Sequence, residues 1–335
     1  KKLGSRLGPD YIVVGALRSA GSPGDALQVE VSLRHGSSGR PVASYRSEGT
    51  THELFTMVSS VGRELRARLG LAPLSRGDLT SLQAERPASL EVAQLYAEGR
   101  KLLHRFDLVG AQKVLTRVVE AEPDYPLGHL ALSDALLALG RETEARREIR
   151  RAFELSGRLP RAARSLIEAR YHEAPAEWPK AFALYRALRI AFPDDPEFGL
   201  YLTEAQRRAG LPDEALRTVA ELRRLSTRVA DDPRLELAAA KAQMDLSDFA
   251  AAVQAIGRAV AQAEAAASPL LLAQALLPDA FARANLNEHQ VALTSAGRAR
   301  DLFAAAGNTA GQSEAMIAAG SAYIALGDYA RSEQV

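Results

Sequence analysis

Two short stretches of the chain carry residue types that take part in phosphoryl transfer. Residues 104–107 read HRFD, which shares a histidine, an arginine and an aspartate with the catalytic loop of protein kinases. Asp248 and Phe249 begin like the DFG motif, whose aspartate binds magnesium. Neither stretch is accompanied by a glycine-rich loop or a strand lysine, and both fall where two predicted helices turn. We therefore interpret both as structural turns.

The other residue types that support catalysis or metal binding are scattered. The six histidines show no HExxH or similar ligand spacing, no GxSxG elbow is present, and the chain has no cysteine. Gly36 and Gly39 in HGSSGR suggest a phosphate loop, but no Lys-Ser or Lys-Thr follows, so a hairpin turn explains them better. We expect no enzyme activity, no cofactor and no metal site in this chain.

A set of charged residues recurs at the ninth position of the first helix in successive predicted helical hairpins, with alternating sign. These residues are Arg100, Asp134, Arg170, Glu204 and Lys241. A ladder of ion pairs between neighbouring repeats is one explanation, and a charged groove for a peptide or partner segment is the other. Further candidates for this partner-binding groove are Tyr96, Glu197, Arg207, Arg234 and Phe281, of which the two aromatic residues fit a core position equally well.

These candidates belong to a helical repeat that covers most of the chain. Small residues recur at Ala111, Ala145, Ala181, Ala215, Ala252 and Ala292, at intervals of 34, 36, 34, 37 and 40. Small residues at such positions allow two helices to cross closely. A spacing of 34 with a small residue, an alanine and a proline, here Gly99, Ala111 and Pro123, is the tetratricopeptide (TPR) pattern.

Residues 89–335 therefore resemble a TPR array, and the predicted fold is mainly α, a solenoid of about six and a half helical hairpins. The predicted repeats lie near residues 92–125, 126–160, 162–195, 196–231, 233–268, 273–308 and an incomplete 313–335. Because a hairpin cannot bury its apolar face alone, we expect the final half-repeat to expose an apolar edge.

Before the array, residues 1–70 predict a small α/β domain, and residues 71–88 a linker. Residues 11–17 (YIVVGAL) are typical of a buried strand, residues 27–34 of a strand with one wet face, and residues 41–48 contain a third strand. A helix then follows from Thr51 to Gly70. Its apolar stripe, expected to cover the sheet, is Leu54, Val58, Val61, Leu65 and Leu69. We expect upstream sequence to supply a further strand and helix.

The segments LGPDYIVVGALRSAG and SYRSEGTTHELFTMVSSVGRELRARLGL resemble the closing half of the TolB N-terminal and FlgO-like α/β domain. The later run LIEARYHEAPAEWPKAFALYRALRIAFPDDPEFGLYLTEAQRRAGLPDEAL looks like the carboxy-terminal array of bacterial eukaryotic-type serine/threonine protein kinases. This resemblance implies a non-catalytic interaction and sensor region, with the kinase domain upstream and absent here. It also implies a parent anchored in the inner membrane with this region extracytoplasmic, or alternatively a cytoplasmic one. The same tandem occurs behind winged-helix regulators of the CadC type, and a free-standing assembly scaffold is the third alternative.

Charge and hydropathy exclude two classes of partner. The chain has 42 basic and 41 acidic residues, so no overall field attracts nucleic acid. No stretch reaches the ~20 apolar residues of a membrane-spanning helix. A local basic surplus at residues 141–170 includes Arg147 and Arg150, which we expect on a solvated outer face, the alternative being an acidic partner.

Overall fold

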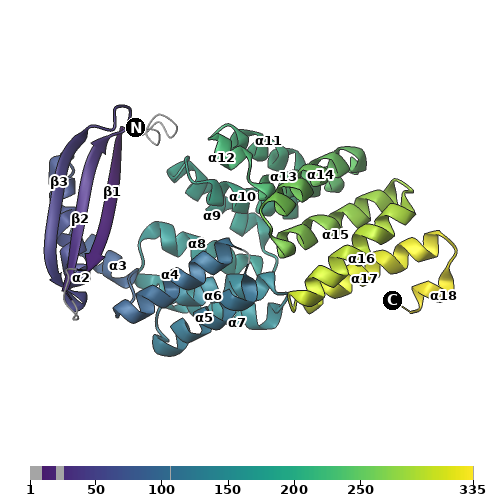
Figure 1. Cartoon of the computed structure of the whole chain (residues 1–335), viewed down its shortest axis with the longest axis horizontal. Helices are drawn as coiled ribbons and strands as arrows, with labels where there is room; N and C mark the ends of the chain where they lie inside the picture. Colours follow the sequence, from purple (N-terminus) through teal and green to yellow (C-terminus); the bar gives the residue numbers. More distant parts are fainter. Residues whose placement is uncertain (1–9, 20–25, 106, 335) are drawn as a thin grey trace. The chain divides into compact units, whose positions relative to one another are not determined.

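The computed structural model describes residues 10–19, 26–105 and 107–334 (Figure 1). The chain divides into two compact units, Lys1–Ala93 and Gln94–Val335. The first contains a sheet and its covering helix, and the second contains the helical hairpins.

The first unit is built on a three-stranded antiparallel sheet in the order β1-β2-β3, as the alternation of apolar residues predicts. Its strands are β1 (Tyr11–Ser19), β2 (Ala26–His35) and β3 (Pro41–Thr50), followed by the short helix η1 (Thr51–Glu53) and by α2 (Leu54–Arg68). The predicted hairpin turn closes β2 onto β3, where the His35 N–H donates to the Arg40 carbonyl at 2.9 Å. Gly39 takes a φ of 67° there, which glycine adopts without strain.

Helix α2 packs on β2 and β3, and this placement corrects two predictions. Met57 and Val61 are buried against the sheet, whereas Val58 is 51% exposed, so Val61 lies in the buried stripe as predicted and Met57 takes the place expected for Val58. The predicted burial of residues 11–17 is wrong, because Val13 and Leu17 are each 55% exposed. The strand β1 pairs with β2 at the edge of the described sheet, so its apolar side chains lack the helix that covers its neighbours.

The segment expected to be a linker includes a short helix, α3 (Arg76–Ala84). Its start is fixed by a capping box, in which Ser75 Oγ accepts the Asp78 N–H at 3.1 Å and the Asp78 carboxylate accepts the Ser75 N–H at 3.0 Å.

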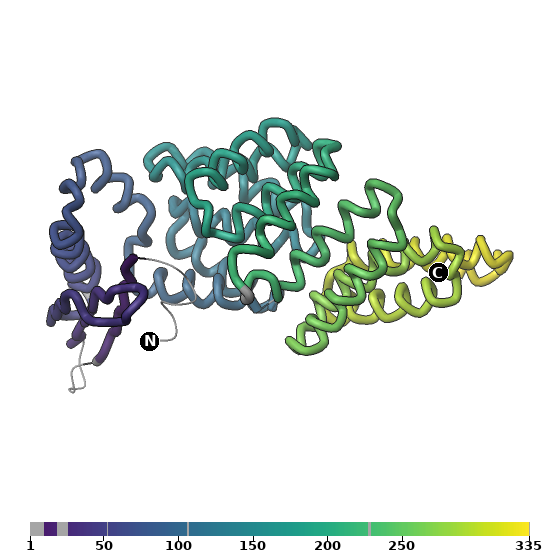
Figure 2. The backbone as a smooth tube through the Cα atoms, turned by 90° about the horizontal axis from the view of Figure 1, so that it is seen from above, coloured from purple at the N-terminus to yellow at the C-terminus, as the bar shows by residue number. Residues whose placement is uncertain are grey.

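The hairpins follow one another along the chain, with one first helix and one second helix in each (Figure 2). Their helices are α4 (Leu90–His104), α5 (Leu108–Ala121), α6 (Pro126–Ala138), α7 (Glu142–Leu155), α8 (Arg161–Glu173), α9 (Trp178–Ala191), α10 (Pro196–Arg208), α11 (Pro212–Arg223), α13 (Pro233–Asp245), α14 (Phe249–Ala265), α15 (Pro269–Asn285), α16 (His289–Ala305), α17 (Thr309–Ala325) and α18 (Tyr329–Ser332). Two single turns, η2 (Ser156–Arg158) and α12 (Thr227–Ala230), lie between hairpins. The predicted helical-hairpin solenoid is confirmed.

The recurring alanines lie where the helices of each hairpin cross, as their spacing predicts. Ala111, Ala181 and Ala252 are fully buried, at 0% exposure. Opposite them the first helix also needs small residues: a Cβ added to Gly99 would lie 2.5 Å from Leu115 Cδ2. Close backbone approach therefore explains both halves of the repeat pattern.

The widening of the repeat from 34 to 40 residues has a simple structural cause. Helices α14, α15, α16 and α17 each contain 17 residues, whereas α5–α11 contain between 12 and 14. The last hairpins are about one helical turn longer per helix.

The described residues of the two kinase-like stretches lie where one helix ends and the next begins. Helix α4 ends at His104, and Asp107 caps α5 by accepting the Gly110 N–H at 2.9 Å. Asp248 caps α14 in the same way, accepting the Ala251 N–H at 3.1 Å. Each aspartate side chain accepts a hydrogen bond from the first turn of the helix that follows it. Both aspartates therefore have a structural role as helix caps.

Two segments far apart in the sequence meet within the second unit. The turn between α6 and α7 contacts the turn between α16 and α17, and the Asn308 side-chain amide donates to the Ala138 carbonyl at 2.9 Å (Figure 1). Leu139 and Phe303 lie in one buried cluster beneath this contact, with 2% and 3% exposure. We call the contact of residues 138–140 with residues 303–311 the seam.

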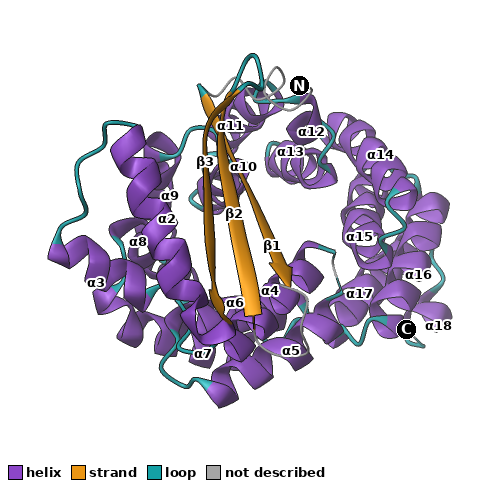
Figure 3. Cartoon of the chain, turned by 60° about the vertical axis from the view of Figure 1, so that its left-hand side comes forward, coloured by secondary structure: helices purple, strands orange, loops and turns teal. Residues whose placement is uncertain are grey.

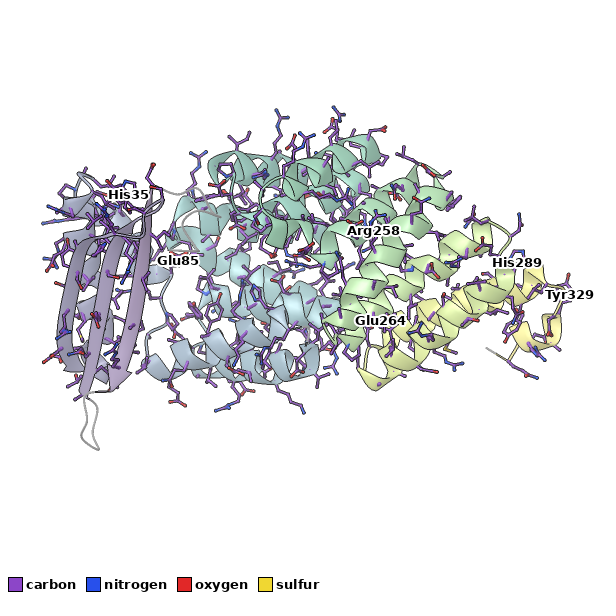
Figure 4. All side chains as sticks on the ribbon, turned by 45° about the horizontal axis from the view of Figure 1, so that its top comes forward. His35, Glu85, Arg258, Glu264, His289 and Tyr329 are labelled. Carbon is purple, nitrogen blue, oxygen red and sulfur yellow. The ribbon has the colours of Figure 1, made fainter. Side chains whose placement is uncertain are left out.

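The final helices expose apolar residues, as predicted for an incomplete repeat. Ile317 on α17 is 63% exposed, and Tyr329 on α18 is 65% exposed (Figure 4).

Candidate partner-binding site

The first helices of the hairpins form the inner side of the solenoid, and the second helices form its outer side (Figure 3). Two hollows lie on that inner side, with volumes of about 770 and 600 Å³. The first is lined by residues from the ends of α4 and α8, the middle of α6, and the starts of α10, α13 and α15. The second is lined by the later parts of α6, α10, α13 and α15 and by the start of α17.

One wall of the first hollow is an ion-paired network centred on Arg170. Its guanidinium donates to Asp134 on α6, with Nε to Oδ1 at 3.1 Å, and to Glu173 at 2.6 Å. The Tyr185 hydroxyl donates to Glu173 Oε1 at 2.6 Å, and the guanidinium stands 5.4 Å from the Tyr201 ring centre. Burial lowers the pKa of Arg170, whereas the negative charges of Asp134 and Glu173 raise it. The increase outweighs the decrease, so the net pKa lies well above its usual value. The arginine is permanently charged and fully engaged.

A second ion-paired group lies in the same hollow. Arg234 on α13 forms a two-pronged contact with Glu197 on α10, at 2.7 and 3.0 Å, and also donates to Asp232 at 2.7 Å. Burial lowers the pKa of Arg234, yet its bonds to Asp232 and Glu197 raise the net value. Paired arginine–carboxylate forks fix side-chain geometry as well as charge.

Arg100 differs from these arginines. Its half-buried side chain lines the first hollow, but in the described ranges it forms no ion pair. Burial lowers its pKa, while Tyr96 and the carboxylate of Asp134 raise it, with a net increase. The guanidinium is therefore a charged donor that a ligand can reach without breaking a salt bridge.

The second hollow combines charge with apolar surface. Arg207 donates to Asp245 at 3.0 Å and to Glu204 at 2.9 Å, while Lys241 lies nearby on the lining. Burial raises the pKa of Glu204, but the charges of Lys241 and Arg207 lower it to about 2. Phe281 lines the hollow too, so this ring is accessible from the inner side.

Pro278 changes the backbone of α15 at the second hollow. Because proline has no N–H, the carbonyl of Gln274 loses its usual helix donor. Gln274 and Pro278 both line the hollow.

The structure distributes the sequence-predicted residues over both hollows. Five line the first: Arg100, Asp134, Arg170, Glu197 and Arg234. Three line the second: Arg207, Lys241 and Phe281. Glu204 lines neither hollow, and its carboxylate accepts hydrogen bonds from Arg207 and Arg208. Tyr96 packs edge-to-face on Tyr125, with ring centres 5.3 Å apart.

The predicted ladder at the ninth position forms one rung among the described residues, Asp134 with Arg170. The other inter-repeat pairs are offset, because Arg234 reaches Glu197 and Arg207 reaches Asp245. The ninth-position rule missed Tyr201, Asp232 and Asp245. Asp232 had a detectable signal, since an aspartate before a proline is a typical helix cap, and it accepts the Arg234 N–H at 2.9 Å.

Comparison with known proteins gives a fold and no family. No family model matches the chain, and no curated protein does. Among solved structures, a Rap protein complexed with Competence and Sporulation Factor superposes with a TM-score of 0.58 at 14% identity, over 73% of this chain and 75% of that one. A STAND signal-transduction ATPase with a tetratricopeptide repeat sensor, from Pyrococcus horikoshii, gives 0.50 at 14% identity, over 84% and 42%.

A tetratricopeptide repeat protein from Parabacteroides merdae gives a TM-score of 0.44 at 14% identity, over 72% of this chain and 89% of that one. The helical hairpins and the likeness to the Rap protein and the archaeal ATPase give the second unit the TPR solenoid fold.

The described residues contain no group of three or more histidine, cysteine, aspartate or glutamate side chains arranged to hold a metal ion. The helices within the same described ranges also include none that combines the length and apolar character needed to cross a membrane.

Proposed function

We propose that the inner surface of the array binds an extended peptide or a segment of a partner protein. The observation that carries this proposal is Arg100, a half-buried charged donor without an ion pair among the described residues, in a hollow where Arg170 and Arg234 are held by carboxylates. In this proposal the chain is the non-catalytic interaction and sensing region of a bacterial signalling protein.

The size and rigidity of the hollows favour a segment over a folded domain. Ligand pockets usually enclose about 300–1,000 Å³, and each hollow falls in that range, which accommodates a few side chains. The walls are already fixed by ion pairs between hairpins, so less side-chain entropy is lost on binding. Two hollows in succession suit a segment that places side chains in both.

Two of the similar solved structures support a binding role for the array. The Rap protein is described in complex with Competence and Sporulation Factor, and the archaeal ATPase is described as carrying a TPR sensor. The shared fold makes sensing by ligand capture a reasonable role for this array.

The finer part of the proposal concerns the parent protein. The resemblance of residues 1–70 and of the array supports a serine/threonine protein kinase whose catalytic domain lies upstream, with the α/β domain coupling the array to it. The parent would then be anchored in the inner membrane. The upstream reading frame tests this directly: HRD and DFG motifs would support the kinase, whereas a winged helix would contradict it.

The binding proposal is tested with a random peptide library displayed against the full 335-residue chain. Arg100→Glu and Lys241→Glu should each abolish or strongly weaken capture of the selected peptides, because each reverses a lining cation that forms no ion pair among the described residues. The matched control reverses Arg147 and Arg150, which are exposed on α7. Capture that survives the inner reversals but is lost in the control would contradict the proposal and favour the outer face.

A further inference from the structure

The seam joins parts of the second unit that are 170 residues apart in the sequence. The Asn308 side chain has two roles there: its amide donates to the Ala138 carbonyl at 2.9 Å, and its carbonyl accepts the Gly311 N–H at 2.8 Å. The second bond caps α17, and the first reaches across to the end of α6. One residue thus ties the start of the last hairpin to the second hairpin.

The approach of the two turns is close enough to require glycine. Gly140 takes a φ of 74°, and a Cβ at this position would lie 2.3 Å from the Ala310 Cβ. Real Cβ atoms do not approach to that distance, so any side chain at residue 140 must separate the two turns. The equivalent glycine two hairpins later, Gly210, has a φ of 79° with nothing within 4 Å of its Cβ.

The second hollow lies on the seam. Its lining includes Leu137 and Gly140 on one edge, and Phe303, Asn308 and Ala310 on the other. An occupant of this hollow therefore contacts both edges at once. Binding and seam closure stabilise each other, because the occupant gains its full contacts when the two edges are together.

We propose that the seam between residues 138–140 and 303–311 is a gate, whose opening admits a polypeptide segment to the inner surface and whose closure retains it. Opening separates the hydrogen-bonded turns and the buried cluster that contains Leu139 and Phe303, through small rotations between neighbouring hairpins. The gate deepens the proposed binding function and rests on it for its biological purpose.

The test uses Gly140→Ala with Gly210→Ala as its matched control. Both substitutions impose the same left-handed backbone on alanine, so both carry similar strain. They differ in that the methyl group at residue 140 collides with Ala310, whereas the one at residue 210 meets open space. Any property changed in the first variant and unchanged in the second reports the seam.

The separation of the edges is measured with spin labels on Thr143→Cys and Thr309→Cys, which are exposed on the two sides. The chain has no cysteine of its own, so labelling is specific. We expect one short distance in the parent and in Gly210→Ala, and a population of longer distances in Gly140→Ala. Unchanged distances in Gly140→Ala would overturn the gate.

Access is measured separately, with a single Gln274→Cys in the second hollow. The modification rate by a polymer-linked maleimide, relative to N-ethylmaleimide, should rise several-fold in Gly140→Ala and stay constant in Gly210→Ala. Longer label distances without faster polymer modification would show that the seam opens but controls no entry, and would also overturn the proposal.

Asn308→Asp provides a second variant that keeps the helix cap. Aspartate still accepts the Gly311 N–H but can no longer donate to the Ala138 carbonyl, so it should open the seam while α17 stays capped. If Gly140→Ala does not fold, the spin-label distances and the maleimide modification rate are measured in Asn308→Asp instead. Unchanged distances, or longer distances without faster polymer modification, would again overturn the proposal. A library that yields no peptide, combined with a seam that opens on substitution, would reject the proposed binding function and leave the gate intact.

Discussion

Arg170 and Asp134 are 36 residues apart, yet Arg170 Nε donates to Asp134 Oδ1 at 3.1 Å and joins α8 to α6. The two side chains are 15% and 19% exposed. Water therefore screens their charges little, and the pair fixes the orientation of two neighbouring hairpins.

Replacing Arg170 by alanine should reduce the free energy of unfolding by about 3–5 kcal/mol, because it leaves two mostly buried carboxylates without their cation. Chemical denaturation of the full chain measures the change. Arg298 is the control, since its contact with Glu264 is 3.1 Å long but half exposed, and its removal should cost less than about 1 kcal/mol. Equal losses in the two variants would contradict a structural role for the inner pair.

Tyr185→Phe tests the other end of the same network. The Tyr185 side chain is fully buried, and its hydroxyl donates to Glu173 at 2.6 Å. Its loss leaves a carboxylate oxygen without a donor, which should cost about 1.5–3 kcal/mol in urea denaturation. Tyr329→Phe, on a side chain that is 65% exposed, should leave stability unchanged.

Gly99→Ala should destabilise the first hairpin, although alanine is the better helix former. Its methyl group would lie 2.5 Å from Leu115 Cδ2, and overpacking of this kind costs about 1–3 kcal/mol. Gly257 also lies inside a helix, but nothing is within 4 Å of its added Cβ. Gly257→Ala should therefore raise the melting temperature, with a gain of about 0.5–1 kcal/mol. The prediction is confirmed if Gly99→Ala lowers the melting temperature and Gly257→Ala raises it, and it is contradicted if both variants shift the melting temperature in the same direction.

Glu204 should make the protein sensitive to acid. Burial raises its pKa, but Lys241 and Arg207 lower it from 4.5 to about 2. Because the folded value is below the unfolded one, the carboxylate stabilises the fold above pH 4.5 and loses this effect as pH falls toward 2. The stability gap between the parent and Glu204→Gln should narrow over that window in urea titrations.

Lys241→Met provides the companion measurement for this pH dependence. Removing the ammonium group should raise the pKa of Glu204, so the acid loss should begin at higher pH. A pH profile identical to the parent's would contradict the assigned cause.

Much of the solenoid could be predicted because its determinants are local. Ala111 and Ala252 mark helix crossings through a period set by two helices and two turns, and Asp107 and Asp248 start helices with their own side chains. The strand β1 was predicted less well, because burial depends on what covers a strand and not on its apolar content.

The inner surface was only partly predictable, for a geometrical reason. A fixed position in each first helix found Asp134 and Arg170, but side chains as long as arginine reach past the nearest rung, as Arg207 does to Asp245. The seam depends on rotations summed over several hairpins. No local pattern around Ala138 or Asn308 reports that sum.

The change in helix length gives the inner surface a direction. A first helix of 13 residues spans about 20 Å and one of 17 residues about 25 Å, so the wall formed by α15 and α17 is taller than that formed by α6 and α10. A bound segment lying along this wall, as proposed above, would have shorter helices beside one of its ends and longer helices beside the other. Reversing the segment's amino-to-carboxyl sense would exchange those surroundings, so the proposed binding surface would distinguish the two directions of a bound chain.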